Sequence, residues 1–451
     1  MTDALTDALT DSINALMPRA KADLAELVAI PSVADPRQYP IENCHRAAAW
    51  VADAFRELGF DDVELADTID GSKAVIGHRP GPEGAPTVLL YCHYDVQPPL
   101  NDAAWTSPPF ELTERDGRWY GRGAADCKGN IAMHLTALRA LGPDIPVHLT
   151  LIAEGSEEQG TGGLEDYVPK HAEQLRADAI LVCDTGNAAV GRPAATIMLR
   201  GIANVVVTVS ALESAMHSGM FGGPAPDALA ALVRILATLR DAQGNTTIDG
   251  LDNKQTWKGA PYDPEQFRAD ATMLEGTRLL GSGSIAEMLW ARPAVTILGI
   301  DAPPVVGSSA AIQNTAAARL NLRVPPGADP HKAQDLLIAH LKKAAPWGVR
   351  VEVEPESTGS PFQAGTTGPA YAALAEAMEQ SYGTAMTTLG QGGSIPLCNV
   401  FADTFPQAEI VLIGVEEPRC LIHAPNESVD PTEIARMAEA EARFLRLYGA
   451  E

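Results

Sequence analysis

Short apolar runs alternate with stretches of helical periodicity over roughly the first 200 residues of the chain. Continuous apolar runs of this length are typical of buried strands, whereas apolar residues three and four positions apart indicate amphipathic helices. The predicted strands are Thr87–Tyr91, Val147–Ala153 and Ala179–Cys183, and the predicted helices are the N-terminal segment, Cys44–Leu58, Ile131–Leu141 and Gly163–Leu175. Strands that alternate with helices predict a layered α/β sheet with helices on both faces.

The pattern changes at Arg200. An alternating strand (GIANVVVTVSAL) and a strongly periodic helix (PDALAALVRILATLRDA) are followed by a polar, tryptophan-bearing insertion at Gly244–Trp290. Strands are then predicted at Ala294–Ile300, Ala317–Val324 and Val349–Glu354, with a helix at His331–Lys343 before the last strand. This β-α-β-β-α-β order is that of the ferredoxin-like fold. We therefore expect an inserted α+β domain over residues 200–356.

The first domain is expected to resume after this insertion, with a helix at Pro369–Tyr382, a strand at Ile410–Ile413 and a final helix from Pro431. The predicted fold class is therefore α/β, with a mixed central sheet flanked by helices in residues 1–199 and 357–451. A second domain also suits the length of 451 residues, because a single core seldom grows beyond ~250–300 residues.

Composition excludes several classes of partner. The formal net charge of −25 argues against binding to nucleic acid or anionic lipid, because both require a basic surface. The chain shows neither a signal peptide nor an apolar stretch near the ~20 residues of a membrane span. Its six cysteines are scattered without a CxxC pair, which is typical of reduced thiols. We therefore expect a cytoplasmic protein without nucleic-acid or membrane partners.

Acidic residues and histidines cluster where the predicted strands end. In chain order they are His93, Asp95, Asp126, Glu157, Glu158, Asp184 and His423. In an α/β sheet, groups of this kind gather on loops beyond the strand ends, where functional sites form.

These residue types suit a pair of metal ions. A catalytic zinc ion takes histidine nitrogen and carboxylate oxygen as ligands, and two metals that share a carboxylate can polarise a carbonyl and activate water. One further, unligated carboxylate can then carry protons. The set supplies two histidines, two terminal carboxylates, one bridge and one spare, with Asp95 left as a supporting acid. Taken singly, each group has a commoner explanation, such as a loop hydrogen bond, a solvated surface pair or a helix N-cap.

Together with their flanking residues, the clusters resemble a family of dinuclear-zinc amidohydrolases. That family includes carboxypeptidase G, carnosinase, cytosolic nonspecific dipeptidase, aminoacylase and succinyl-diaminopimelate desuccinylase. The segments YCHYDVQP, GRGAADCKG, EGSEEQGTGG, LVCDTG, MHSGMFGG, GQGGSIP and HAPNE follow the family order over nearly the whole chain. The length of the chain and its YDVQP segment are most similar to the dipeptidase branch.

The resemblance implies a site for two divalent ions, with Zn²⁺ expected first and Mn²⁺ or Co²⁺ also suited to such ligands. Asp126 would bridge the two ions. His93 and Asp184 would complete the ligands of one ion, and Glu158 and His423 those of the other.

Two further acids have roles that the resemblance implies. Asp95 would hold the second ring nitrogen of His93 and so fix the orientation of that imidazole. Glu157 would be the general base, which takes a proton from the attacking water and returns it to the leaving amine. The peptide bond after Asp126 is typically cis in this family, and here it leads to Cys127, where the family often has Asp or Asn.

The inserted domain, by the same resemblance, is a lid through which two chains form a homodimer. His217 in MHSGMFGG is similar to a lid histidine that reaches into the neighbouring subunit's site and stabilises the oxyanion. Arg323 is similar to a lid arginine that binds a substrate carboxylate. Residues Gly392, Gly393 and Ser394 would help to seat the substrate.

One segment departs from the family pattern. SSAAIQNT places Ala310 where a carboxylate contact often lies, with Ser308 or Ser309 as possible replacements. The departure leaves open which groups contact the substrate there.

The expected function is hydrolysis of dipeptides of the Cys-Gly or β-Ala-His type, by a catalytic domain at 1–199 and 357–451 under a lid at 200–356. An alternative with the same chemistry is removal of the acyl group from N-acyl amino acids, which requires an apolar acyl pocket. A third hypothesis is a non-catalytic metal-binding assembly protein. The presence of Glu157 disfavours it, since only turnover requires that residue.

Overall fold

The computed structural model describes residues 2–450, which form two compact units. The first comprises the residues up to Ile197, Ala364–Leu389 and the residues from Leu397, and the second comprises Met198–Gln363 and Gly390–Pro396. The domain limits expected from sequence, 199/200 and 356/357, lie near these divisions. The short Gly390–Pro396 segment was expected in the first domain but belongs to the second unit.

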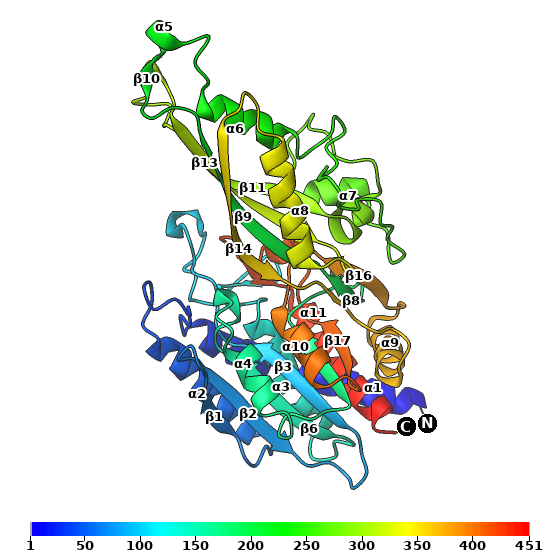
Figure 1. Ribbon diagram of the computed structural model, residues 1–451. Helices are drawn as coiled ribbons and strands as arrows, with labels where there is room; N and C mark the ends of the chain where they lie inside the picture. The colour runs from blue at the N-terminus through cyan, green and yellow to red at the C-terminus, as the bar shows by residue number, and fades with distance from the viewer. Residues whose placement is uncertain (1, 451) are drawn as a thin grey trace. The chain divides into compact units, whose positions relative to one another are not determined.

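A mixed sheet forms the centre of the first unit (Figure 1). Its strands are, in spatial order, β1 (Glu64–Asp67), β2 (Lys73–Arg79), β6 (His148–Glu154), β3 (Thr87–His93), β7 (Ala179–Cys183), β17 (Glu409–Ile413) and β8 (Ala194–Leu199). At the edge, β8 also pairs with β15 (Phe362–Gln363) and β16 (Thr387–Gln391). The inner strands β6, β3, β7 and β17 run parallel, whereas β2 and β8 are antiparallel to their neighbours. Buried parallel strands are near-continuous apolar runs, which explains why the sequence identified these strands.

Helices flank this sheet, and most of them contribute to its core. They are α1 (Thr2–Val28), α2 (Glu42–Arg56), α3 (Lys128–Leu141), α4 (Gly163–Lys170), α9 (Pro369–Tyr382), α10 (Pro396–Thr404) and α11 (Pro431–Tyr448). The start of α11 follows from local chemistry, because the Asp430 carboxylate accepts from Thr432 N and Pro431 occupies the first turn. The predicted extension of α4 to Leu175 is wrong. The helix ends at Lys170, just after Pro169, and separate turns follow.

Smaller elements complete the first unit. They are the short helices η1 (Asp102–Ala104), η2 (Glu157–Gln159) and η4 (Pro418–Cys420), and a three-stranded sheet of β18 (Ser428–Val429), β5 (Arg118–Tyr120) and β4 (Thr113–Arg115).

The second unit contains a four-stranded antiparallel sheet in the order β11 (Ala294–Asp301), β13 (Thr315–Val324), β9 (Gly201–Ser210) and β14 (Arg350–Gly359). Helices α6 (Ala228–Ala237) and α8 (Pro330–Lys343) share one apolar core with the sheet (Figure 1). With the chain order β9-α6-β11-β13-α8-β14, this is the ferredoxin-like arrangement. The predicted fold class is confirmed.

Two excursions leave this second sheet. The polar insertion carries α7 (Pro264–Asp270) and η3 (Glu287–Ala291), and the rings of Trp257 and Trp290 meet edge to face at 5.0 Å. The other excursion pairs β10 (Met216–His217) with β12 (Ala311–Ile312) and continues into α5 (Ser218–Phe221). Within residues 2–450, no helix is both long and apolar enough to cross a membrane.

Candidate metal centre and active site

Three neighbouring parallel strands of the first unit deliver acids and histidines to one edge of the sheet. His93 is the last residue of β3, and Asp184 directly follows β7. Glu157 and Glu158 lie in η2, just after β6. Because the ends of parallel strands meet at the same edge, residues distant in sequence come together there.

Asp126 lies at the centre of the cluster and uses a different oxygen toward each histidine. Its Oδ1 is 3.0 Å from His93 Nε2, which also lies 3.0 Å from Asp184 Oδ1. Its Oδ2 is 2.9 Å from His423 Nε2, which lies 3.0 Å from Glu158 Oε2. The structure thus brings the five residues expected as metal ligands into two groups that share Asp126.

The loop that carries Asp126 is held by Glu427, a fully buried acid that the sequence analysis did not single out. Glu427 Oε1 accepts hydrogen bonds from the backbone N–H groups of Ala125 and Asp126, at 3.1 Å each. Its Oε2 accepts from Gly123 N at 3.1 Å and from Arg122 Nη1 at 2.6 Å. The only available signal was its place in the HAPNE segment.

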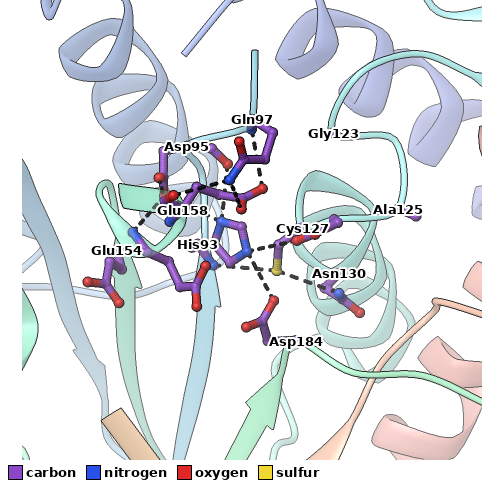
Figure 2. Close-up of polar contacts among 12 residues, drawn as sticks. His93, Asp95, Gln97, Gly123, Ala125, Cys127, Asn130, Glu154, Glu158 and Asp184 are labelled. Atoms are coloured by element: carbon purple, nitrogen blue, oxygen red, sulfur yellow. Dashed lines mark hydrogen bonds and ion pairs between the residues drawn. The ribbon is translucent and has the colours of Figure 1, made fainter. Parts of the chain in front are cut away.

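The peptide bond between Asp126 and Cys127 is cis, as the resemblance implies. Cys127 is buried and lies beside His93, with Asn130 and Asp184 around it (Figure 2). Its thiol donates to Cys183 O at 3.0 Å and lies 3.5 Å from His93 N. The Cys127 side chain therefore contacts the ends of both β3 and β7, next to His93 and Asp184.

Asp95 supports two parts of the site. His93 Nδ1 lies 3.1 Å from the backbone carbonyl of Asp95 and 3.4 Å from its carboxylate. That carboxylate also accepts from the backbone N–H groups of Glu157 and Glu158, at 3.2 and 3.0 Å. Gln97 was not singled out from sequence, yet its Nε2 donates to Glu158 Oε2 at 2.8 Å (Figure 2).

His423 lies in a tight segment after η4. Leu421, His423 and Asn426 all have positive φ, a conformation that is unfavourable for residues other than glycine. Contacts to the first half of the chain hold the segment, since Asn426 Oδ1 accepts from Thr106 N at 2.9 Å and Asn426 Nδ2 donates to Ala104 O at 2.8 Å.

Burial, together with the crowding of carboxylates, shifts the pKa values of the site. Burial and then the charge of Asp184 raise the pKa of Glu157 well above its ordinary value. Burial and then Asp126 raise the pKa of Glu158 to about 7. Burial also opposes the charged forms of His423 and Asp126, but their mutual hydrogen bond raises the histidine's pKa to about 11 and lowers that of Asp126. Within residues 2–450, no hydrogen bond reaches the Glu157 carboxylate, which lies near the charges of Asp184 and Glu158.

A further carboxylate, Glu416, was not singled out from the sequence either. It is buried, and it offers an oxygen within 4.8 Å of oxygens of Asp126 and Asp184. Its Oε1 has no hydrogen-bond partner among the described residues. A buried carboxylate without a partner, next to two others, is typical of a site where divalent cations neutralise the negative charge. The donor set, imidazole nitrogen and carboxylate oxygen, also fits zinc and related ions.

The remaining expected site residues lie in the second unit. His217 is exposed on β10, where its Nδ1 accepts from Gly219 N at 3.1 Å. Ala310 lies on the facing segment, and its carbonyl accepts from Ser218 N at 2.8 Å. Arg323 lies near the end of β13. Gly392, Gly393 and Ser394 lie between β16 and α10.

Comparison with known proteins gives the family of the chain. The model of peptidase family M20/M25/M40 matches residues 89–447. The chain is 44% identical over 444 residues to a cysteinylglycine-S-conjugate dipeptidase of Corynebacterium striatum, covering 96% of this chain and 97% of that protein. It is 28% identical over 455 residues to a Beta-Ala-His dipeptidase of Rattus norvegicus, covering 94% and 91%. Its fold is similar to the crystal structure of human carnosine dipeptidase 1, with a TM-score of 0.83 and 25% identity over 99% of each chain. The resemblance seen in the sequence is confirmed: the chain belongs to peptidase family M20/M25/M40 and is a metallopeptidase, a hydrolase of peptide bonds.

Proposed function

We propose that the first unit holds two divalent ions, Zn²⁺ foremost, with Asp126 as the shared ligand. His93 and Asp184 would hold one ion, and Glu158 and His423 the other. The observation that carries this proposal is that Asp126 presents Oδ1 to the first group and Oδ2 to the second, at 3.0 and 2.9 Å. A carboxylate that faces two ligand groups with separate oxygens has the arrangement of a bridge.

Bound ions would polarise the substrate carbonyl and make water easier to deprotonate. Glu157 accepts the proton of the attacking water and later delivers it to the leaving amine. Its raised pKa suits both steps, because a group with pKa nearer neutrality can accept and then release a proton. Asp95 orients His93 and fixes the η2 backbone, so that Glu157 and Glu158 keep their separate roles.

The proposed substrates are dipeptides of the Cys-Gly type, including those that carry a substituent on the cysteine sulfur. The relative at 44% identity supports this choice, since it is a cysteinylglycine-S-conjugate dipeptidase and the match covers nearly all of both chains. All six cysteines are buried and none forms a disulfide. That state supports the expected cytoplasmic location, because reducing compartments keep thiols free.

The second unit is proposed to act as a lid and to join two chains into a homodimer, with His217 serving the partner subunit's site and Arg323 the substrate. The edge strand β11 supports this role. Its residues Ile297, Leu298 and Ile300 are 45–56% exposed although apolar. Exposed apolar side chains on an unpaired sheet edge are typical of an interface.

The test is an activity assay with defined metal content. Purified protein is stripped of metal, reloaded separately with Zn²⁺, Mn²⁺ or Co²⁺, and offered Cys-Gly, S-benzyl-Cys-Gly, β-Ala-His and N-acetylmethionine. We expect hydrolysis of the two cysteinylglycines, only after reloading, with about two ions per chain by elemental analysis. Hydrolysis of N-acetylmethionine alone would instead establish a deacylase, and full activity without metal would contradict the proposed centre.

A further inference from the structure

A carboxylate in the turn between β1 and β2 contacts the segment that carries Glu157. Asp70 lies in this turn, and its Oδ2 accepts hydrogen bonds from Ser156 Oγ and Thr161 Oγ1, at 2.5 Å each. Ser156 directly precedes η2, and Thr161 follows shortly after the end of that helix. A single oxygen of Asp70 therefore holds both ends of the segment that presents Glu157.

The two oxygens of Asp70 serve different parts of the chain. Its Oδ1 accepts from Thr68 Oγ1 at 2.6 Å and from Ser72 N at 3.0 Å, and these bonds stabilise the turn itself. Its Oδ2 instead reaches Ser156 and Thr161, which are 86 and 91 positions away in the sequence. An aspartate that served only the turn would not need the second pair of bonds.

Ser156 does not cap η2, although serine is favoured at the N-cap position. Its hydroxyl accepts no hydrogen bond from the first turn of that helix. The backbone N–H groups of Glu157 and Glu158 donate to the Asp95 carboxylate instead. The Ser156 hydroxyl can therefore donate to Asp70, and two acids hold η2 from different sides.

A glycine at the start of α4 leaves space for the Asp70 carboxylate. A side chain at Gly163 would place its first carbon 2.7 Å from Asp70 Oδ2, which is too close unless one of the two segments moved. Burial opposes ionisation of Asp70, but hydrogen bonds from Ser156, Thr161 and Thr68 hold its pKa well below the usual range. Neutral donors from the Glu157 segment thus stabilise the charged form of Asp70.

We propose that Asp70 is a positioning residue, which holds both ends of the η2 segment so that the Glu157 carboxylate keeps its place for proton transfer. This inference rests on the proposed function, in which Glu157 carries the proton. Because no hydrogen bond within residues 2–450 reaches the Glu157 carboxylate, its place depends on the backbone and packing of its own segment. Asp95 holds the N–H groups of that backbone, and Asp70 holds its two ends.

The first experiment measures turnover by the metal-loaded enzyme, on Cys-Gly or on whichever of the offered substrates the wild type hydrolyses. Asp70→Ala should lower kcat by ~10–100-fold, as expected for a displaced catalytic group, while KM and the two bound ions are unchanged. Thr161→Val, at an exposed position, removes one of the two bonds and should lower kcat by ~2–10-fold. The matched control Asp67→Ala removes an exposed carboxylate from the same hairpin and should equal wild type.

A double substitution separates positioning from a general structural role. If Asp70 acts through Glu157, adding Asp70→Ala to Glu157→Gln should not lower the residual kcat further, because the group to be positioned is already absent. An equal loss in both backgrounds would overturn the proposal. So would an unchanged kcat in Thr161→Val together with Asp70→Ala, and Thr161→Val alone decides if Asp70→Ala does not fold.

Hydrogen exchange provides a measurement that does not require activity. The backbone amides of residues 156–161 should exchange faster in Asp70→Ala and Thr161→Val than in wild type and Asp67→Ala. If the wild type hydrolyses none of the substrates but these amides respond as expected, the proposed function fails and the role of Asp70 in holding the segment stands. If the wild type is active and neither exchange nor kcat responds, only the positioning role fails.

Discussion

At the scale of single residues, the division of labour among neighbouring carboxylates comes from their contacts. Asp126 faces two histidines, Glu158 faces one histidine and Gln97, and Glu157 faces none. The three acids belong to the same cluster, yet their substitution should therefore have different consequences.

Removal of Asp126 should affect both ions, because both ligand groups depend on it. We expect Asp126→Ala to retain fewer than one ion per chain, whereas His423→Ala should lose mainly one of two. Elemental analysis after dialysis measures this directly. Asp144→Ala, at an exposed position, serves as the control and should keep both ions. Two ions retained in Asp126→Ala would rule out the bridging role.

Substitution of Glu157 should separate metal binding from turnover. Glu157→Gln removes the proton carrier but none of the proposed ligands, so we expect two bound ions and an unchanged KM. Its kcat should fall by ~10²–10⁴-fold, as for other general acid–base groups. Steady-state kinetics beside elemental analysis provides the measurement, and near wild-type kcat would show that Glu157 takes no part in the chemistry.

The site residues at strand ends could be found from the sequence. The residues that hold them in place by hydrogen bonds could not. His93 and Asp184 follow apolar runs directly, so their place at a sheet edge was predictable. Glu427 and Gln97 act through contacts that no local pattern reveals; Glu427 accepts from Asp126 N across 301 positions of the chain. Glu416 gave no signal in the sequence, because nothing local distinguishes it from its neighbour Glu417 or from an acid on a solvated loop.

At the scale of elements, the segment between β17 and α11 connects the C-terminal part of the first unit to its N-terminal part through side-chain contacts. It carries His423 toward the Asp126 loop, and Glu427 anchors that loop through its backbone and Arg122. The pair Arg122–Glu427 is buried, with side chains 1% and 0% exposed. Removal of one partner of such a pair leaves a buried charge uncompensated.

Glu427→Gln should therefore destabilise the protein and release metal together. Its amide would direct N–H groups at Gly123 N and Arg122, and we expect a loss of about 3–5 kcal/mol in the free energy of unfolding. Denaturant unfolding followed by tryptophan fluorescence measures this. Glu173→Gln removes an exposed ion pair with Arg176 and should change stability by less than about 0.5 kcal/mol. A similarly small change in Glu427→Gln would show that the anchor is dispensable.

Elements with a clear apolar pattern were predictable, and those with a weak pattern were not. The predicted strands correspond to β3, β6, β7, β17 and the four strands of the second unit, while β1, β2, β8 and α10 went unrecognised. In β2 (KAVIGHR) and β8 (AATIML), polar ends and small residues weaken the pattern, and pairing with neighbours decides the conformation.

At the scale of the whole molecule, the expected site residues divide between two units with separate cores. The proposed metal ligands and Glu157 belong to the first unit, and His217 to the second. The imidazole of His217 is exposed, and its Nε2 has no hydrogen-bond partner among the described residues, so it is available to another molecule.

Complementation between subunits tests the proposed dimer. His217→Ala should keep both metals and lose ~10²–10³-fold in turnover, as for other oxyanion donors. If His217 serves the partner subunit, mixing inactive His217→Ala with inactive Glu157→Gln should restore activity after subunit exchange, because a heterodimer has one complete site. Exchange is followed with differently tagged subunits. A mixture that exchanges and stays inactive, or a fully active monomer, would contradict the role in trans.

The position of β17 in the first sheet also governs how the protein is made. This strand lies between β7 and β8, but the ribosome supplies it only after the whole second unit, whose main segment ends at Gln363. The second unit contains every strand and helix of its own sheet by that point and can fold on emergence. The first unit must wait with an incomplete sheet, although most of it is synthesised earlier. Folding during translation should therefore run opposite to the order of the gene, and metal loading should follow release of the finished chain.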